Sequence, residues 1–180
     1  MADETLQFMK KKLLQKLLFL IVASCFVCLS GNAESYQWKN LSMGGGGFVS
    51  GLITSKQEQN LMYCRTDVGG AYKWNAATST WKPLLDWASA TQSEFYSVES
   101  IAIDPHATNK VYMFVGINYF DNGKTAILKS DDYGQTFTTI DVTSQFKAHG
   151  NGMGRSNGER LQVDPNLGST LYVGTRYNGL

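Results

Sequence analysis

An internal repeat constrains the fold of this chain more than any other feature of its sequence. Three segments align without gaps: LITSKQEQNLMYCRTD from Leu52, IAIDPHATNKVYMFVG from Ile101 and LQVDPNLGSTLYVGTR from Leu161. In each, an apolar stretch leads into a turn residue, and a tyrosine follows eight positions later. The three pairs are Ser55 and Tyr63, Asp104 and Tyr112, and Asp164 and Tyr172. The repeat predicts three copies of a strand, a turn and a second strand.

The spacing of the repeat favours one architecture. The three units start about 50 to 60 residues apart, which is the size of a four-stranded propeller blade rather than of a helical repeat. Asp-Pro pairs at 104–105 and 164–165 suit the turns, because proline fixes φ and the aspartate can bond the downstream backbone. We therefore expect an all-β fold over residues 34–180, a partial β-propeller made of the first two to three blades of a seven-bladed ring.

A second motif also indicates propeller blades. Residues 130–137, SDDYGQTF, fit the pattern S-x-D-x-G-x-T-[W/F] of the Asp-box hairpin. We expect buried Ser130 and Asp132 side chains to bind the turn backbone, and Phe137 to pack between strands. This interpretation of Asp132 is structural, so it is not a catalytic candidate.

The first 33 residues have the pattern of an export signal. Basic residues at 10–12 and 16 precede the mostly apolar run LLFLIVASCFVCLS at 17–30, and small residues precede a cleavage point expected after Ala33. Residues 1–8 fit this pattern poorly, so Met9 is an alternative start. The apolar run is shorter than the roughly 20 residues of an ordinary spanning helix. We expect a secreted protein, extracellular or periplasmic; the stretch VASC leaves a lipoprotein anchored through Cys25 as the alternative.

Charge and ligand patterns argue against several functions. The chain has 16 Lys and Arg against 15 Asp and Glu, a net charge of +1, so no nucleic-acid partner is expected. His106, His149 and Cys64 lack metal-ligand spacing, so no metal is expected. The run GGGG at 44–47 fits no phosphate-binding pattern, and we expect a tight loop near the substrate face with no cofactor.

The glycine-rich segment HGNGMGRSNGERLQVD at 149–164 has two interpretations. It carries Arg155, Glu159 and Arg160. It could contact a ligand at the rim of a cleft, or Glu159 and Arg160 could form a structural ion pair. The structural interpretation is favoured, because loop charges are usually structural or solvated.

The stretch LMYCRTDVGGAYKW at 61–74 places Asp67 where a strand-like run meets a Gly-Gly turn. From the residues alone, this aspartate could cap backbone amides or act chemically at a cleft. Trp87 and Tyr96 lie in apparent loops and could stack on a sugar ring, although core packing is the commoner role of aromatic residues.

Six stretches, in this order, resemble the N-terminal propeller of glycoside hydrolase family 74, the xyloglucan-active endo-glucanases. They are YQWKNLSMGGGGFVSGL, LMYCRTDVGGAYKWN, WKPLLDW, SIAIDP, ILKSDDYGQTF and NGERLQVDP. The resemblance covers essentially everything after the signal. It implies two seven-bladed propellers with a substrate cleft between them, and hydrolysis of β-1,4-glucan backbones with inversion.

The resemblance also implies a site. The aspartate of the family motif Arg-Thr-Asp-[Ile/Val]-Gly-Gly-Ala-Tyr is the general base, and it falls on Asp67. An inverting hydrolase holds its acid about 6.5 to 9.5 Å from the base, which leaves room for water. We expect the cation of Arg65 to keep the pKa of Asp67 low enough for it to act as a base. The expected substrate-binding residues are Arg65, Gly69, Gly70, Tyr72, Trp87 and Tyr96.

Length is the departure from the family. Its members are several times longer, and their general acid lies in the second propeller. We therefore expect the N-terminal part of an enzyme, inactive by itself, whose partners are the polysaccharide and a missing C-terminal propeller. A non-catalytic propeller or a carbohydrate-binding remnant is the alternative, and sequence beyond Leu180 would distinguish the two.

Overall fold

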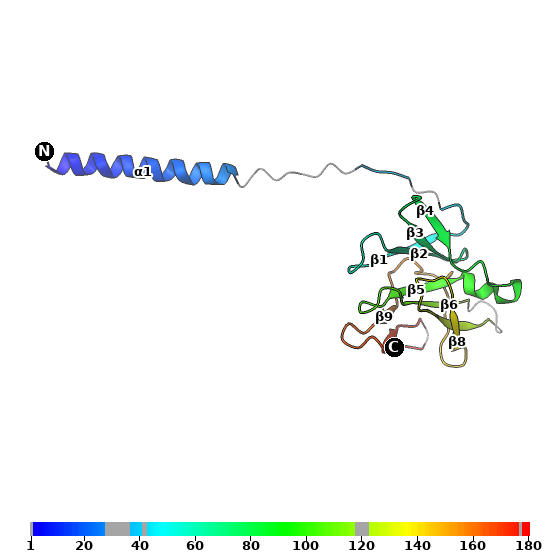
Figure 1. Cartoon of the computed structure of the whole chain (residues 1–180). Helices are drawn as coiled ribbons and strands as arrows, with labels where there is room; N and C mark the ends of the chain where they lie inside the picture. Colours follow the sequence, from blue (N-terminus) through cyan, green and yellow to red (C-terminus); the bar gives the residue numbers. More distant parts are fainter. Residues whose placement is uncertain (1, 28–36, 41–42, 118–122, 177) are drawn as a thin grey trace. The chain divides into compact units, whose positions relative to one another are not determined.

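The computed structural model describes residues 2–27, 37–40, 43–117, 123–176 and 178–180, in an N-terminal unit up to Asn40 and a β unit from Leu41 (Figure 1). The N-terminal unit contains one helix, α1 (Ala2–Val27), which includes the basic residues of the expected leader. The cleavage point expected after Ala33 lies outside the described residues. Within the described ranges, no helix is long and apolar enough to cross a membrane.

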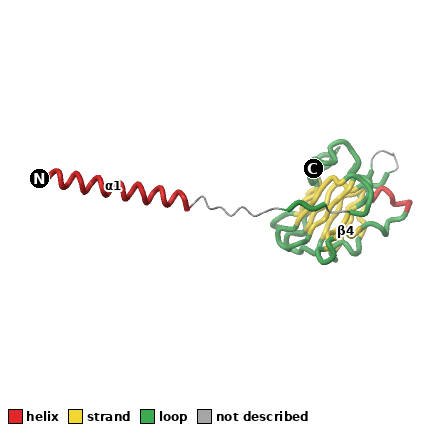
Figure 2. Tube along the Cα trace, turned by 90° about the horizontal axis from the view of Figure 1, so that it is seen from above, coloured by secondary structure: helices red, strands yellow, loops and turns green. Residues whose placement is uncertain are grey.

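The β unit contains two four-stranded antiparallel sheets and one hairpin, each following chain order. The first sheet comprises β1 (Val49–Thr54), β2 (Met62–Thr66), β3 (Ala71–Asn75) and β4 (Thr80–Pro83). The second comprises β5 (Val98–Ile103), β6 (Val111–Gly116), β7 (Thr125–Ser130) and β8 (Thr138–Asp141). The hairpin comprises β9 (Leu161–Val163) and β10 (Leu171–Val173), and the 3₁₀ helix η1 (Ala90–Tyr96) links the two sheets. Figure 2 shows these strands side by side inside the β unit, with loops around them.

The predicted repeat is confirmed at the level of hydrogen bonds. In each unit the turn residue donates its backbone N–H to the carbonyl six positions later: Ser55 to Leu61 at 2.9 Å, Asp104 to Lys110 at 3.0 Å and Asp164 to Thr170 at 2.9 Å. The side-chain oxygens of the turn residues also accept from backbone amides two or three positions later. The first two units share a bulge as well, between Val49 and Gly51 in β1 and between Val98 and Ser100 in β5.

The core lies on both faces of the second sheet, because its central strand β6 is apolar throughout. Val111, Met113 and Val115 join a cluster that includes side chains of the first sheet, such as Tyr63. Tyr112 and Phe114 point the other way, into a cluster that contains Leu161 and Val163 of the hairpin. Alternate residues of a strand point to opposite faces, so one apolar strand can bind two neighbours. This packing fixes the first sheet, and the turn that carries Asp67, against the second.

The turn between β7 and β8 has the hydrogen bonds expected of it, with one correction. The Asp132 carboxylate accepts from Ser130 Oγ at 2.8 Å, from the backbone amides of Gln135 and Thr136 at 2.9 Å, and from Thr136 Oγ1 at 2.6 Å. Phe137 packs against the core shared by the two sheets. Asp132 is half-exposed rather than buried, because the donors it binds lie in the turn itself at the surface.

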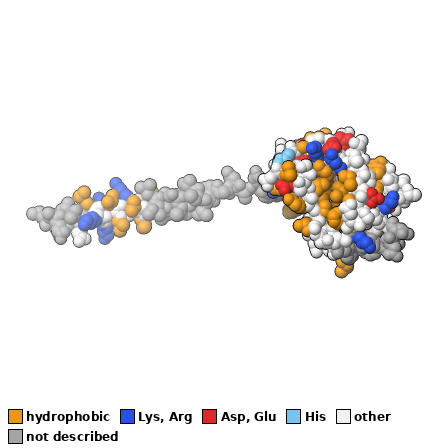
Figure 3. All heavy atoms as spheres, turned by 90° about the horizontal axis from the view of Figure 1, so that it is seen from below, with side chains coloured by type: hydrophobic (Ala, Val, Ile, Leu, Met, Phe, Trp, Pro, Cys, Tyr) orange, Lys and Arg blue, Asp and Glu red, His pale blue; other side chains and the backbone are white. Residues whose placement is uncertain are grey.

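Apolar side chains also gather on one face of the β unit (Figure 3). Large exposed apolar residues are found on three strands: Leu52 on β1, Ile140 on β8 and Tyr172 on β10 are 60%, 44% and 46% exposed. Extended apolar surface of this kind is typical of contact regions.

Candidate active site

Asp67 lies in a turn built from a threonine and two glycines. The backbone N–H and the Oγ1 of Thr66 both donate to the carbonyl of Gly70, at 2.9 Å. The N–H of Gly69 donates to Thr66 Oγ1 at 2.8 Å. Gly70 has φ +82°, in the left-handed region that glycine adopts without strain. The turn is fixed from outside as well, because the N–H of Gly70 donates to the carbonyl of Tyr96 at 2.7 Å.

The carboxylate of Asp67 has one contact on each oxygen. Its Oδ1 accepts from the backbone N–H of Phe48 at 2.7 Å, and its own N–H donates to the Phe48 carbonyl at 3.1 Å. Its Oδ2 lies 3.2 Å from Nε of Arg155. The side chain is 9% exposed. Asp67 is therefore a carboxylate held in a defined orientation at the edge of the β unit.

The glycine run at 44–47 lies directly against this turn. A methyl group at Gly69 would lie 1.8 Å from the Gly46 carbonyl oxygen, and one at Gly47 would lie 2.9 Å from the Gly69 nitrogen. A methyl group at Gly45 would lie 1.9 Å from the Tyr72 hydroxyl. The two backbones approach closely because neither carries a side chain at these positions. The expected tight loop is found, and it adjoins Asp67.

Known proteins are similar to this chain over most of its length. A xyloglucanase of Paenibacillus is 43% identical over 183 residues, which is 96% of this chain and 18% of that protein. The crystal structure of a family 74 enzyme of Niastella koreensis matches 78% of this chain, with 57% identity and a TM-score of 0.72. That of the Xanthomonas campestris xyloglucanase matches 79% of this chain, with 41% identity and a TM-score of 0.70. This chain is a homologue of the glycoside hydrolase family 74 xyloglucanases.

The family 74 relationship covers a limited part of the relatives. The chain spans about a fifth of the length of the proteins it matches, 18% of the Paenibacillus xyloglucanase and 20% of the Niastella koreensis enzyme. No protein-family model matches the chain. The four-stranded antiparallel sheets of the β unit correspond to part of a family 74 fold.

Arg65 lies away from the position expected for it. Its side chain is fully buried, and its Nε contacts Glu159 Oε1 at 2.6 Å. It also donates to Ser50 Oγ and to the carbonyls of Arg155 and Gly158. The cation beside Asp67 is Arg155, not Arg65. Because Arg65 is fully buried, its guanidinium has no surface open to a ligand.

The three aromatic candidates differ in exposure. Tyr72 is 5% exposed, and burial raises the pKa of its hydroxyl. Tyr96 is half-buried and donates its hydroxyl to the carbonyl of Ala88 at 2.8 Å. Trp87 is 43% exposed, and its ring centroid lies 6.2 Å from that of Phe137. Trp87 is therefore the ring among these three with most surface for a ligand, and Tyr96 also supports the Asp67 turn through its carbonyl.

Tyr72 lines a surface pocket of about 560 Å³. Its other lining residues are Met43, Gly44, Gly45, Thr80, Trp81, Pro83 and Asp86. The two aromatic side chains of this pocket, Tyr72 and Trp81, are 5% and 9% exposed, so they offer little surface to a ligand.

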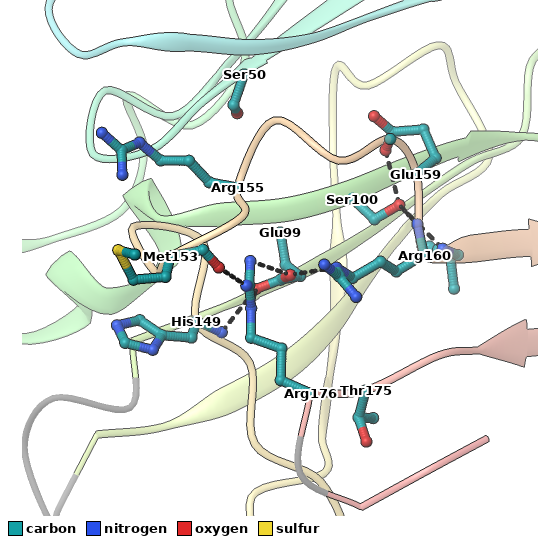
Figure 4. Close-up of polar contacts among 12 residues, drawn as sticks. Ser50, Glu99, Ser100, His149, Met153, Arg155, Glu159, Arg160, Thr175 and Arg176 are labelled. Atoms are coloured by element: carbon teal, nitrogen blue, oxygen red, sulfur yellow. Dashed lines mark hydrogen bonds and ion pairs between the residues drawn. The ribbon is translucent and has the colours of Figure 1, made fainter.

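Two acidic residues near Arg155 form ion pairs with buried or half-buried arginines (Figure 4). Glu99, 2% exposed at its side chain, contacts Arg160 Nε and Arg176 Nη2, both at 2.8 Å. The ion pair expected between Glu159 and Arg160 is replaced by two others, Glu159 with Arg65 and Arg160 with Glu99. Glu159 and Arg160 thus have structural roles, as favoured, but each pairs with a residue outside the loop.

Arg176 was not among the expected site residues, and Arg155 was named only as part of a loop that could contact a ligand. A signal for Arg176 was present in the repeat, because GTRYNG at 174–179 aligns with RTDVGG at 65–70. Thr175 donates its N–H and Oγ1 to the Gly179 carbonyl at 2.8 and 2.9 Å, and Gly179 has φ +80°. The third unit thus repeats the Asp67 turn with Arg176 at the position of the aspartate. Arg155 has no such sequence signal.

No group of three or more His, Cys, Asp or Glu side chains among the described residues could hold a metal ion. The chemistry at this site is that of a carboxylate, an arginine and backbone amides.

Proposed function

We propose that this chain carries the general base of a secreted glycoside hydrolase, which cleaves the β-1,4-glucan backbone of xyloglucan with inversion. The proposed base is Asp67. The observation that supports this most is the setting of its carboxylate, in a glycine turn at the edge of the β unit with one contact on each oxygen. The names of the Paenibacillus and Xanthomonas campestris relatives support the substrate class.

The proposed step transfers one proton to Asp67. A water molecule bound to the carboxylate attacks the anomeric carbon, its proton passes to Asp67, and the bond from that carbon to the leaving oxygen breaks. A general acid on the other face protonates the leaving oxygen, and attack from the opposite side inverts the anomeric centre. The space beside Gly69 is occupied by the backbone of Gly46, so in this proposal the polysaccharide reaches Asp67 from another side. This reaction requires no cofactor.

We propose that the two sheets and the hairpin are blades of a propeller, and that the general acid belongs to a second propeller across a substrate cleft. In this proposal the chain alone does not hydrolyse xyloglucan, because the acid is not among its residues. The polysaccharide and the second propeller are its partners.

A chimeric enzyme tests the role of Asp67. Residues 37–180 replace the matching segment of the Xanthomonas campestris xyloglucanase, which is 41% identical. Asp67→Asn should lower kcat by about 100- to 10,000-fold, because the amide cannot accept the proton of water, while KM for xyloglucan changes little. NMR of the first products should show the inverted anomer in the unmodified chimera.

Asp104→Asn is the matched control. Asp104 is 1% exposed and accepts the His106 N–H at a repeat turn, a bond that an amide oxygen can also accept. Its turnover should stay near that of the unmodified chimera. Near-normal turnover of Asp67→Asn would instead favour a non-catalytic propeller or a carbohydrate-binding remnant.

We also propose that residues 1–33 direct export. Expression of the chain with its own leader should yield an extracellular or periplasmic product that begins at Glu34, as determined by N-terminal sequencing. An intact N-terminus at Met1 or Met9 in the cytoplasm would contradict export, and a lipid on Cys25 would identify a membrane-anchored lipoprotein instead.

A further inference from the structure

The glycine-rich loop, residues 149–160, is held at both ends by one carboxylate. Glu99 accepts the backbone N–H of His149 through Oε2 at 2.9 Å, and its Oε1 lies 2.8 Å from Arg160 Nε. Figure 4 shows Glu99 between the two ends of the loop. Because Glu99 is almost fully buried in β5, the loop is attached to the second sheet at both ends.

The middle of the loop is attached to the first sheet. Arg65 of β2 donates to the carbonyls of Arg155 and Gly158, both at 3.1 Å, and contacts Glu159. A guanidinium offers five donors in a rigid plane, so it can fix several acceptors at once. The backbone at Arg155 is therefore set by a buried side chain on the strand that leads into the Asp67 turn.

The side chain of Arg155 contacts the two residues that define the Asp67 site. Its Nε lies 3.2 Å from Asp67 Oδ2, and its guanidinium carbon lies 5.3 Å from the centre of the Phe48 ring. Phe48 also donates its N–H to Asp67 Oδ1. Arg155 is 36% exposed at its side chain and Phe48 is 53% exposed, so both border solvent next to the carboxylate.

One contact on each oxygen determines the plane of a carboxylate. The torsion between Cβ and the carboxyl carbon of aspartate is broad and has no strong preference. The backbone amide on Oδ1 restrains one oxygen, and the ion pair of Arg155 with Oδ2 further restricts the torsion. Each oxygen has two lone pairs, so both can still accept a hydrogen bond from water.

We propose that Arg155 is a positioning residue for Asp67, which sets the plane of the carboxylate while its cation attracts the carboxylate charge. This inference rests on the proposed role of Asp67 as general base. The planar guanidinium of Arg155 lies within cation–π distance of the Phe48 ring, and lysine has no planar cation, so the conservative change should restore only part of the effect.

The chimera described above provides the test. Arg155→Met should lower kcat by about 10- to 100-fold, because a catalytic group that is misplaced by about 1 Å slows the reaction by up to about 100-fold. KM should change by less than about 3-fold. Arg155→Lys should give a kcat between those of Arg155→Met and the unmodified chimera. Met153→Ala is the matched control from the same loop, because Met153 is 89% exposed, and its kcat should be unchanged.

A double variant separates positioning from a structural role. In the Asp67→Asn background, Arg155→Met should lower kcat by less than about 2-fold, because its effect acts through the Asp67 carboxylate. An equal loss in both backgrounds, or no loss in either, would overturn the proposal. Arg155→Gln replaces Arg155→Met in the same cycle if the latter does not fold. If Asp67→Asn alone leaves kcat unchanged, the proposed function fails, and the positioning role fails with it.

Discussion

Substitution of Glu159 is expected to destabilise the β unit strongly. Its carboxylate accepts hydrogen bonds from Arg65 Nε at 2.6 Å, and from Ser100 Oγ and the backbone N–H of Ile101 at 2.7 Å. Glu159→Gln keeps the size of the side chain. It offers a single carbonyl oxygen to three donors, and it leaves no charge opposite a fully buried Arg65.

The expected cost follows from these contacts. Removing one partner of a buried ion pair costs about 3–5 kcal/mol; here Arg65 is fully buried and the Glu159 side chain is 27% exposed. Arg65 keeps three other acceptors, on Ser50, Arg155 and Gly158, so the lower end, about 3 kcal/mol, is expected. With a slope of about 1–3 kcal/mol per M urea, the unfolding midpoint should fall by about 1–3 M.

Urea unfolding of the chain, followed by tryptophan fluorescence, measures this change. Asp131→Asn is the control, because it removes the same charge from a Lys129–Asp131 pair that is 36% and 56% exposed at its side chains. Such exposed pairs contribute about 0–1 kcal/mol. If Glu159→Gln lowers the midpoint by no more than Asp131→Asn does, Arg65 is not desolvated as the structure indicates, and the reasoning is refuted.

Two further predictions concern the turns. Hydrogen bonds from Thr136 and Ser130 lower the pKa of Asp132 from 3.8 to about 2, so the stability it contributes is fully present above about pH 4 and is lost as the pH falls to about 2. Asp132→Ala should therefore have a lower unfolding temperature than the unmodified chain at pH 6 but the same one below pH 2; an equal gap at both pH values would contradict this. Gly69→Ala should destabilise by roughly 1–3 kcal/mol, because its methyl group would meet the Gly46 carbonyl at 1.8 Å. Gly46→Ala, whose methyl group would have no atom within 4 Å, should lie within about 0.5 kcal/mol of the unmodified chain in the same urea assay; equal effects of the two changes would show that the contact is not tight.

The sequence predicted the repeating turns because their determinants are local. An Asp or Ser side chain and the residues just after it are enough to specify each of these hydrogen bonds. The role of Arg65 could not be predicted in this way. Arg65 and Asp67 are two positions apart, which places side chains on one face of a strand, but β2 ends at Thr66 and Asp67 already belongs to the turn.

Arg155 was beyond prediction for a different reason. It reaches Asp67 through a loop whose course depends on Glu99 in one sheet and Arg65 in the other. Neither contact has a spacing that can be read along the chain. Long-range ion pairs of this kind are determined by the packing of the sheets, so they become visible only in the folded structure.

The turn formed by Thr66 and Gly70, and again by Thr175 and Gly179, does not depend on the side chain that follows the threonine. Its hydrogen bonds come from the threonine and the glycine. The residue after the threonine is Asp67 in the first unit and Arg176 in the third. A catalytic group at this position can thus be gained, lost or reversed in charge by one substitution without rebuilding the backbone. In the third unit, however, Arg176 pairs with the buried Glu99, so a carboxylate at position 176 would also require a change at Glu99.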